Sequence, residues 1–271
     1  MRLMPLALFA AATLPAQEPA RFHHIHLNSV DPEVAIDFYT AKFKAERRVF
    51  AGLGDAVWTG DSWLLFTKVA VPPPSTTVSG IWHFGWGAED MKAAYKKQIE
   101  SGTKFHTPLT DISDLVGGSE NSGRFFYCYI DGPDHALIEL NTARHHNFGH
   151  LHLYSANPMA AAEWYRANLN LRPRVQAEPK TYRGIPVAPA AFITADHVSI
   201  IVYPYPAKLQ PSRGRVVDHL GFAVKNLDDS VKRVRANGTK ATAGPAMRSG
   251  VRSAFLEGPD QVAIELLKLP D

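Results

Sequence analysis

Short apolar runs and longer segments of helical periodicity alternate along the whole chain. The first run, Phe22 to Asn28, has the composition of a strand and contains histidine, and the spacing of Val34, Phe38 and Phe43 behind it suits the 3.6-residue period of a helix. Similar runs with histidine open three further units: Ile81 to Gly87, Gly149 to Ser155 and Val217 to Val224. The pattern therefore predicts four units, each beginning with a strand and a helix.

Residues typical of helix ends mark where these helices begin and end. Asp31 and Asn157 are suited to the N-cap position, and the prolines that follow them are suited to the first helical position. In the second and fourth units, Gly102 and Gly238 stand where a helix C-terminus favours a left-handed residue.

After each helix come short strand-like runs, which complete a βαβββ unit. They include Ser62 to Val69, Phe125 to Ile130, Ala136 to Leu140, Val198 to Tyr203 and Val262 to Leu267. No low-complexity linker separates the units, and only the brief polar segment Ala143 to Phe148 joins the two halves.

An internal duplication supports this division. The pair His24 and His26 recurs as His150 and His152 (150 − 24 = 126), and residues 131–140 recur at the same offset as 257–266, each with Gly-Pro-Asp before a strand that contains glutamate. Between these anchors His83 matches His219 at an offset of 136 (219 − 83 = 136).

The change of offset identifies two loops in which the halves differ most. They are Asp111 to Gly123, rich in glycine and serine, and Ala177 to Pro189, rich in proline and small residues. We expect them either to contact substrate or act as lids, or to be inert surface insertions.

The opening histidine strands, the Asp/Asn-Pro helix starts and the Gly-Pro-Asp motif before the last strand resemble the vicinal oxygen chelate superfamily. This group includes glyoxalases, bleomycin resistance proteins and extradiol dioxygenases. The resemblance implies an α+β fold, with four βαβββ units paired into two cupped, incomplete β-barrel halves. The predicted divisions are a first half, 22–143, with units 22–69 and 80–141, and a second half, 148–268, with units 148–204 and 216–268.

In this family the opening strands and last strands converge on one metal ion. The resemblance therefore implies a triad in each half: His24, His83 and Glu139 in the first, and His150, His219 and Glu265 in the second. Two imidazoles and a carboxylate leave coordination positions open, which suits Fe(II), or Zn(II) or Mn(II). Family precedent favours the second half as the metal-binding one, although this chain keeps both sets.

The register of the opening strand decides between neighbouring histidines. His24 is preferred as the ligand because it lies seven residues before Asp31, the spacing that recurs in the third and fourth units. Alternate residues of a strand share a face, so His26 should point with His24 while His23 points away. His26 and, by the same reasoning, His152 are candidate catalytic residues beside the metal, or else histidines satisfied in the core.

Tyr129 is a candidate acid or base. It lies ten residues before Glu139 on the preceding strand, where its hydroxyl could donate to an oxyanion, and its counterpart Phe255 could not. This difference favours chemistry in the first half, against the family precedent; the alternative is a core aromatic.

The resemblance most favours a metal-dependent enzyme for a small substrate with adjacent oxygens, such as an extradiol ring-cleavage dioxygenase. A glyoxalase-like lyase or isomerase is the alternative, although Leu64 to Lys68 and Ser199 to Tyr203 supply no fourth Glu, Gln or His ligand. A non-catalytic protein that sequesters a small molecule is a further alternative.

Composition narrows the partners and the compartment. The net charge is +3 and the basic residues are scattered, so we expect no nucleic-acid partner. Residues 1–16 resemble a signal peptide, with one positive charge and a short apolar run, which predicts a secreted or periplasmic protein without a membrane anchor after cleavage. Cys128 is the only cysteine, so no disulfide forms within the chain. A homodimer is a further expectation, because family members often pair units between chains.

Overall fold

The computed structural model describes residues 18–116, 124–176, 180–182, 185–187 and 190–268. The predicted signal peptide, 1–16, and parts of both variable loops lie outside the described residues.

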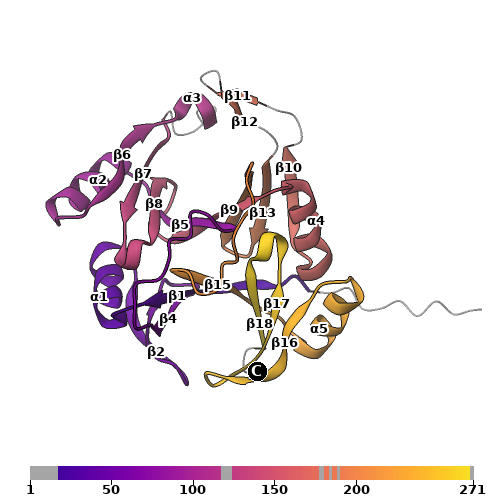
Figure 1. The fold of residues 1–271 in the computed structure, drawn as a ribbon. Coiled ribbons are helices and arrows are strands. Elements are labelled where there is room, and N and C mark those ends of the chain that lie inside the picture. The colour runs from indigo at the N-terminus through magenta and orange to yellow at the C-terminus, as the bar shows by residue number, and fades with distance from the viewer. Residues whose placement is uncertain (1–17, 117–123, 177–179, 183–184, 188–189, 269–271) are drawn as a thin grey trace, which may run out of the picture.

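The described residues form four units in chain order, each a strand, a helix and further strands (Figure 1). The first unit consists of β1 (Arg21–Ser29), α1 (Pro32–Lys42), β2 (Glu46–Phe50), β3 (Gly54–Trp58) and β4 (Trp63–Lys68). The second consists of β5 (Ile81–Ala88), α2 (Met91–Glu100), β6 (Phe105–Asp111), the short helix α3 (Ser113–Val116), β7 (Phe126–Asp131), a 3₁₀ turn (Pro133–His135) and β8 (Leu137–Thr142).

The third and fourth units repeat this plan. The third consists of β9 (Phe148–Ser155), α4 (Pro158–Leu169), β10 (Arg172–Gln176), the hairpin strands β11 (Lys180–Tyr182) and β12 (Ile185–Val187), β13 (Ala190–Ala195) and β14 (Val198–Pro204). The fourth consists of β15 (Val217–Ala223), α5 (Leu227–Ala236), β16 (Ala241–Arg248), β17 (Val251–Glu257), a 3₁₀ turn (Pro259–Gln261) and β18 (Ala263–Lys268).

The helices begin where the sequence predicts. The side chains of Asp31 and Asn157 accept hydrogen bonds from the backbone N–H groups of Val34 and Ala160, and a proline follows each cap. Gly102 and Gly238 have positive φ just after α2 and α5.

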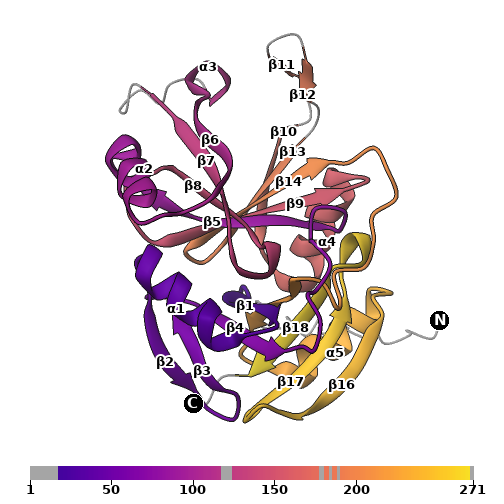
Figure 2. The ribbon, with the colours of Figure 1, turned by 60° about the vertical axis from the view of Figure 1, so that its left-hand side comes forward.

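The units pair across the chain halves rather than within them. One eight-stranded sheet has the order β16-β17-β18-β15-β1-β4-β3-β2, so it joins the first and fourth units; the other has the order β10-β13-β14-β9-β5-β8-β7-β6 and joins the second and third. Figure 2 shows these two sheets one above the other. The α+β fold of paired units is as expected and the cups are not closed barrels, but the expected pairing within 22–143 and within 148–268 is wrong.

Chain connections explain the crossed pairing. Segment 143–147 is short, so the second and third units stay neighbours in one sheet, whereas the longer segments 69–80 and 205–216 pass from one sheet to the other. These two crossing segments run side by side, since the backbone N–H of Gln210 donates to the carbonyl of Val78 and that of Val216 to the carbonyl of Pro74.

Each sheet is built around its two opening strands. β1 pairs with β15, and β5 with β9, both antiparallel, and each opening strand also pairs in parallel with the last strand of its own unit. This arrangement places histidines of two units and a glutamate of one unit on neighbouring strands.

The faces of the sheets away from the histidines form the core. On β1, Ile25 and Leu27 are buried in this core, while His24 and His26 point to the other face. Phe22 joins the two sheets, because its ring packs on Phe148 and Phe222 with centroid distances of 6.0 and 5.7 Å.

The Gly-Pro-Asp motif forms hydrogen bonds between the two sheets. Asp134 and Asp260 adopt a left-handed conformation, with φ of 53° at both. Their carboxylates accept hydrogen bonds from the backbone N–H groups of Val30 and Ala156, which directly follow β1 and β9 of the opposite sheets. The recurrence of the motif therefore reflects a structural contact.

No helix among the described residues is long and apolar enough to cross a membrane.

The junction between the sheets yields a prediction about stability. Phe22 is 3% exposed, so Phe22→Ala should lower the free energy of unfolding by about 3–5 kcal/mol, through lost burial and the cavity that remains. Val49→Ala is the control, because Val49 is 72% exposed and should change stability by less than about 0.5 kcal/mol. Urea titration measures both, and equal effects would contradict the assigned junction.

Candidate metal centres

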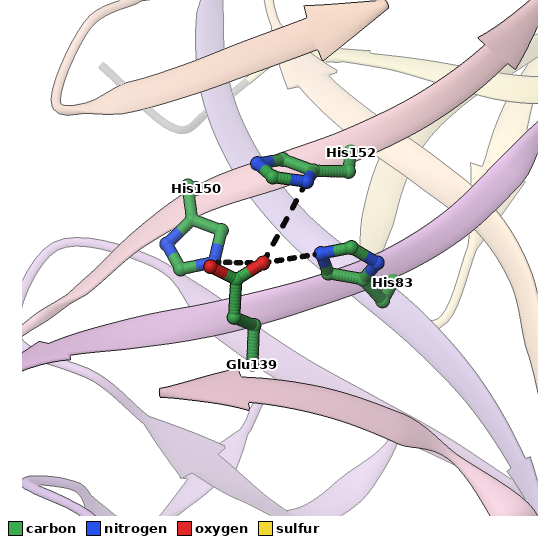
Figure 3. Close-up of side chains that lie close together, drawn as sticks. All are labelled: His83, Glu139, His150 and His152. Atoms are coloured by element: carbon green, nitrogen blue, oxygen red, sulfur yellow. Dashed lines mark hydrogen bonds and ion pairs between the residues drawn. The ribbon is translucent and has the colours of Figure 1, made fainter. Parts of the chain in front are cut away.

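Four side chains of the second and third units converge in one buried cluster, which we name site A: His83, Glu139, His150 and His152 (Figure 3). His83 Nε2 lies 2.6 Å from Glu139 Oε2, and His150 Nε2 and His152 Nδ1 lie 3.7 and 3.6 Å from the same oxygen. One ligand atom from each residue lies within 4.8 Å of the others. The cluster therefore has the dimensions of a metal-binding site.

Strand register assembles site A. His83 of β5 is opposite His152 of the antiparallel strand β9, and Gly85 is opposite both His150 and, on the parallel strand β8, Glu139. A Cβ atom on Gly85 would lie 2.2 Å from the carbonyl oxygen of Glu139 and 2.4 Å from His150 Nε2. Only glycine leaves room here for the imidazole to turn toward the carboxylate.

The charges of site A suit a cation. Burial opposes ionisation of Glu139, but His152, His150 and His83 outweigh it and hold the pKa of this carboxyl well below its usual range. Burial lowers the pKa of His150 to about 4 and lowers that of His152 well below its usual value. His150 and His152 thus present neutral imidazoles beside an anionic carboxylate, which are the forms that bind metal.

The first and fourth units form a second cluster, site B, with the same residue types: His24, His26, His219 and Glu265. His24 Nε2 and His219 Nε2 lie 3.3 and 3.4 Å from Glu265 Oε2. Burial opposes ionisation of Glu265, but the neighbouring imidazoles of His219 and His24 outweigh it and hold the pKa of this carboxyl far below its usual range.

Neighbouring side chains orient the two histidines of site B. His219 Nδ1 lies 2.6 Å from Asp218 Oδ1, so the ring donates its proton to this carboxylate and directs the lone pair of Nε2 toward Glu265. His24 Nδ1 shares a hydrogen bond of 2.8 Å with His23 Nδ1. A shift in strand register between Phe22 and His24 interrupts the alternation, which is why His23 contacts His24 rather than pointing away as expected.

The sites therefore group the predicted ligands differently from the sequence analysis. His24 lies in site B with His219 and Glu265 rather than with His83 and Glu139, and His150 takes its place in site A. All six candidate ligands lie in one or other cluster, together with His26 and His152. The correction therefore concerns only which units contribute to the same site.

Buried nitrogen atoms without partners indicate that both clusters accommodate a cation. Among the described residues, Nε2 of His24, His150 and His219 and Nδ1 of His152 are buried with no hydrogen-bond partner. Such atoms cost free energy unless something satisfies them, and lone pairs that converge on a carboxylate are satisfied by a metal ion. The residues of both sites thus fit a divalent metal.

The surroundings of the two sites differ. In site A, Tyr129 pairs across the strands with Glu139, and its ring centroid lies 4.8 Å from that of His83; Trp82 and Tyr203 are further aromatic neighbours. Tyr129 is therefore placed beside the cluster, as the sequence analysis expects.

In site B, Phe255 stands in the position of Tyr129, 5.1 Å from the ring of His219, and Arg213 lies 4.1 Å from the centre of the Phe255 ring. His26 Nε2 forms a hydrogen bond of 2.7 Å with Thr67 Oγ1. Site B therefore has basic neighbours and lacks the phenol.

Fold and sites together define a protein of paired βαβββ units with a buried histidine-glutamate cluster in each pair. The chain belongs to the Glyoxalase/Bleomycin resistance protein/Dioxygenase superfamily, whose model matches residues 21–140 and again residues 147–266. The resemblance on which the sequence analysis relied is thereby confirmed.

Solved structures show the same fold. Glyoxalase I from Zea mays has a TM-score of 0.72 and 14% identity, with 92% of each chain covered. A proposed dioxygenase from Bacillus subtilis has a TM-score of 0.63 and 14% identity, with 94% of this chain and 87% of that chain covered. No curated protein matches the chain.

Sequence reasoning missed Asp218 and Arg213 beside site B, and it placed His23 on the wrong face. Asp218 directly precedes a candidate ligand, a spacing that could have marked it as a carboxylate able to orient the imidazole. Arg213 has no comparable signal, because only the folded chain brings it to Phe255.

The crossed grouping predicts how paired substitutions combine. In protein reconstituted with Zn(II), Glu139→Ala should remove about half of the bound metal, and adding His150→Ala should remove no more, because both residues serve site A. Combining Glu139→Ala with His219→Ala should remove nearly all of it. Metal analysis gives the number of metal ions bound per chain in each variant. If the ligands were grouped by chain half, the double variant Glu139→Ala with His150→Ala would instead lose the metal of both sites.

The lowered pKa of His150 predicts a pH dependence for the metal-free protein. The unfolded histidine titrates near pH 6.5 and the folded one near 4, so the unfolded chain binds more protons in this range. Stability should therefore fall as pH decreases from about 6.5 to 4. In urea titrations at several pH values His150→Asn should reduce this slope, whereas His106→Asn, at an exposed histidine, should leave it unchanged.

Proposed function

We propose that the protein is a divalent-metal-dependent enzyme that acts at site A on a small substrate with two adjacent oxygens, most like an extradiol ring-cleavage dioxygenase. The observation that carries this proposal is the combination of two imidazoles and one carboxylate, His83, His150 and Glu139, with Tyr129 beside them. A metal held by such a set can bind two substrate oxygens and act as a Lewis acid.

The residues beside this set have opposite proton-transfer roles. Burial raises the pKa of Tyr129, and the negative charge of Glu139 raises it further, so the phenol stays protonated and donates a hydrogen bond to a substrate oxygen. Burial keeps His152 neutral, so its Nδ1 has a lone pair available for a substrate proton, and the lowered pKa makes this imidazole a weak base. Tyr129 thus serves as the donor and His152 as the acceptor.

Aromatic side chains shape the space beside these groups. Trp82 stacks on Tyr154 with a centroid distance of 4.6 Å and contacts the rings of His83 and Tyr203. A flat, unsaturated ring with adjacent oxygens is compatible with such walls. The proposed substrate class is therefore a catechol or a similar small aromatic molecule.

A glyoxalase-like lyase is the second candidate, and one contact favours it. Because His152 Nδ1 lies 3.6 Å from Glu139 Oε2, His152 can serve as a fourth protein ligand, which lyase sites usually provide. In that case His152 would bind metal instead of accepting a proton.

Metal content and two assays separate these candidates. Protein purified without chelator is analysed for iron, manganese and zinc, and then assayed for oxygen uptake with catechol and for isomerisation of the hemithioacetal of methylglyoxal and glutathione. The proposal expects iron and catechol-dependent oxygen uptake. Zinc together with isomerase activity supports the lyase, and tight ligand binding by metal-free protein supports sequestration. Export of the protein and dimer formation stay predictions.

The role of Tyr129 gives a sharper prediction. Tyr129→Phe removes the hydroxyl and keeps the ring, so kcat should fall by about 100-fold or more while metal content stays unchanged. Tyr95→Phe is the matched control, because Tyr95 lies on α2 and packs on Phe105, and it should keep wild-type kcat. Oxygen uptake under saturating catechol measures kcat for both variants. A wild-type kcat in Tyr129→Phe would contradict the proposed role of this hydroxyl as a proton donor.

A further inference from the structure

Site B borders a small cavity that two hairpins enclose. The cavity has a volume of about 140 Å³. Its lining combines residues of the cluster with Phe50 and Leu53 from the β2–β3 hairpin and Arg248, Ser249 and Val251 from the β16–β17 hairpin. Pockets for drug-sized ligands measure about 300–1,000 Å³, so this cavity suits only a molecule of a few heavy atoms.

The tips of these hairpins touch each other. A Cβ atom on Gly52 would lie 2.5 Å from the backbone nitrogen of Gly250, and one on Gly250 would lie 2.7 Å from the carbonyl oxygen of Ala51. Two glycines thus allow backbone to meet backbone at the edge of the cavity.

The equivalent hairpins of the other sheet are longer. The connection from β6 to β7 includes α3, and that from β10 to β13 includes β11 and β12. Figure 1 shows these insertions at one end of the molecule, with β2 and β16 at the opposite end. The hairpins of the two sheets therefore differ in length, and the short pair meets beside the cavity of site B.

Arg248 supplies a positive charge to the cavity. Its guanidinium donates to the backbone carbonyls of Gly244, Ala246 and Ser253, which fixes the side chain. A guanidinium carries five N–H donors, so two are left for a further acceptor. Among the described residues no carboxylate forms an ion pair with Arg248.

The carboxylates near this cavity already have partners other than Arg248. Asp218 binds Arg213 at 3.2 Å and His219 at 2.6 Å, and Glu265 faces the two imidazoles where a metal would bind. The charge of Arg248 is thus left for a ligand. Because guanidinium groups form strong, charge-assisted hydrogen bonds with carboxylates, a carboxylate is the fitting anion.

From the cavity, the cluster and this arginine we infer that site B binds a small α-hydroxy or α-keto carboxylate, through a metal held by His24, His219 and Glu265 and through Arg248. A ligand of this class would offer two adjacent oxygens to the metal, and its negative charge would be recognised by the guanidinium. The inference rests on the metal-binding part of the proposed function, but it assigns to site B a ligand class different from that of site A.

Titration calorimetry with glycolate tests the inference. The experiment uses full-length Glu139→Ala reconstituted with Zn(II), so that site B holds the remaining metal. Adding Arg248→Met should weaken glycolate binding about tenfold or more without changing metal content. Arg252→Met is the control: it removes the same charge from β17, where Arg252 pairs with exposed Asp228, and should leave binding unchanged.

A second ligand tests whether the charge of glycolate is recognised, and a variant of Glu265 tests whether glycolate binds at site B. Glycolamide keeps two adjacent oxygens but has no negative charge, so Arg248→Met should not change its affinity. In Glu265→Ala, which retains site A, the tight glycolate binding should disappear. Equal glycolate affinity in Arg248→Met and Arg252→Met, or retention of tight binding in Glu265→Ala, would overturn the inference.

The same variants distinguish a failure of the site B inference from a failure of the function proposed for site A. If Glu139→Ala holds no metal while the wild-type protein holds metal and oxidises catechol, the inference fails and the function of site A stands. If Glu139→Ala holds metal and binds glycolate through Arg248, but the wild-type protein converts neither catechol nor the hemithioacetal, the inference for site B stands and the enzyme proposal fails.

Discussion

Both candidate metal centres depend on the antiparallel pairing of opening strands that belong to different halves of the chain. β1 with β15, and β5 with β9, bring histidines of two units to one face, and the parallel last strand adds glutamate. Neither half of the chain contains a complete centre, because each site takes its ligands from both halves. Metal binding is therefore coupled to the assembly of the whole chain.

The unit structure and the ligand types could be predicted from the sequence, because they depend on local patterns. His24 and His150 stand 126 residues apart in matching surroundings, and the Gly-Pro-Asp motif marks the start of the last strand in each half. The grouping of ligands could not be predicted in this way. Four similar units offer the same edges to one another, so the repeat is equally compatible with pairing within halves and across them. The short segment 143–147 was the available signal, since a short connection keeps consecutive units together.

Once two copies of a site exist, their surroundings can diverge while the ligands stay the same. Tyr129 in site A corresponds to Phe255 in site B, and Trp82 to Asp218. Asp218 holds one tautomer of the neighbouring imidazole and makes it a stronger ligand, whereas Trp82 offers only a ring face. The phenol lies where a proton can be donated, and the carboxylate lies where a metal ligand is held in place. The two centres thus differ in chemistry and not only in position.

Hairpin length extends this divergence to the substrate. A hairpin can lengthen at low cost in loop entropy when its ends remain fixed in a sheet, so insertions accumulate at tips rather than within strands. In this protein the insertions occur on the sheet of site A, whereas glycine tips meet beside site B. Since metal ligands lie within strands and hairpin tips lie at their ends, the size of the admitted molecule can change without disturbing the metal. The two ligand classes proposed above, an aromatic substrate at site A and a small anion at site B, therefore require no change in the cluster of histidines and glutamate.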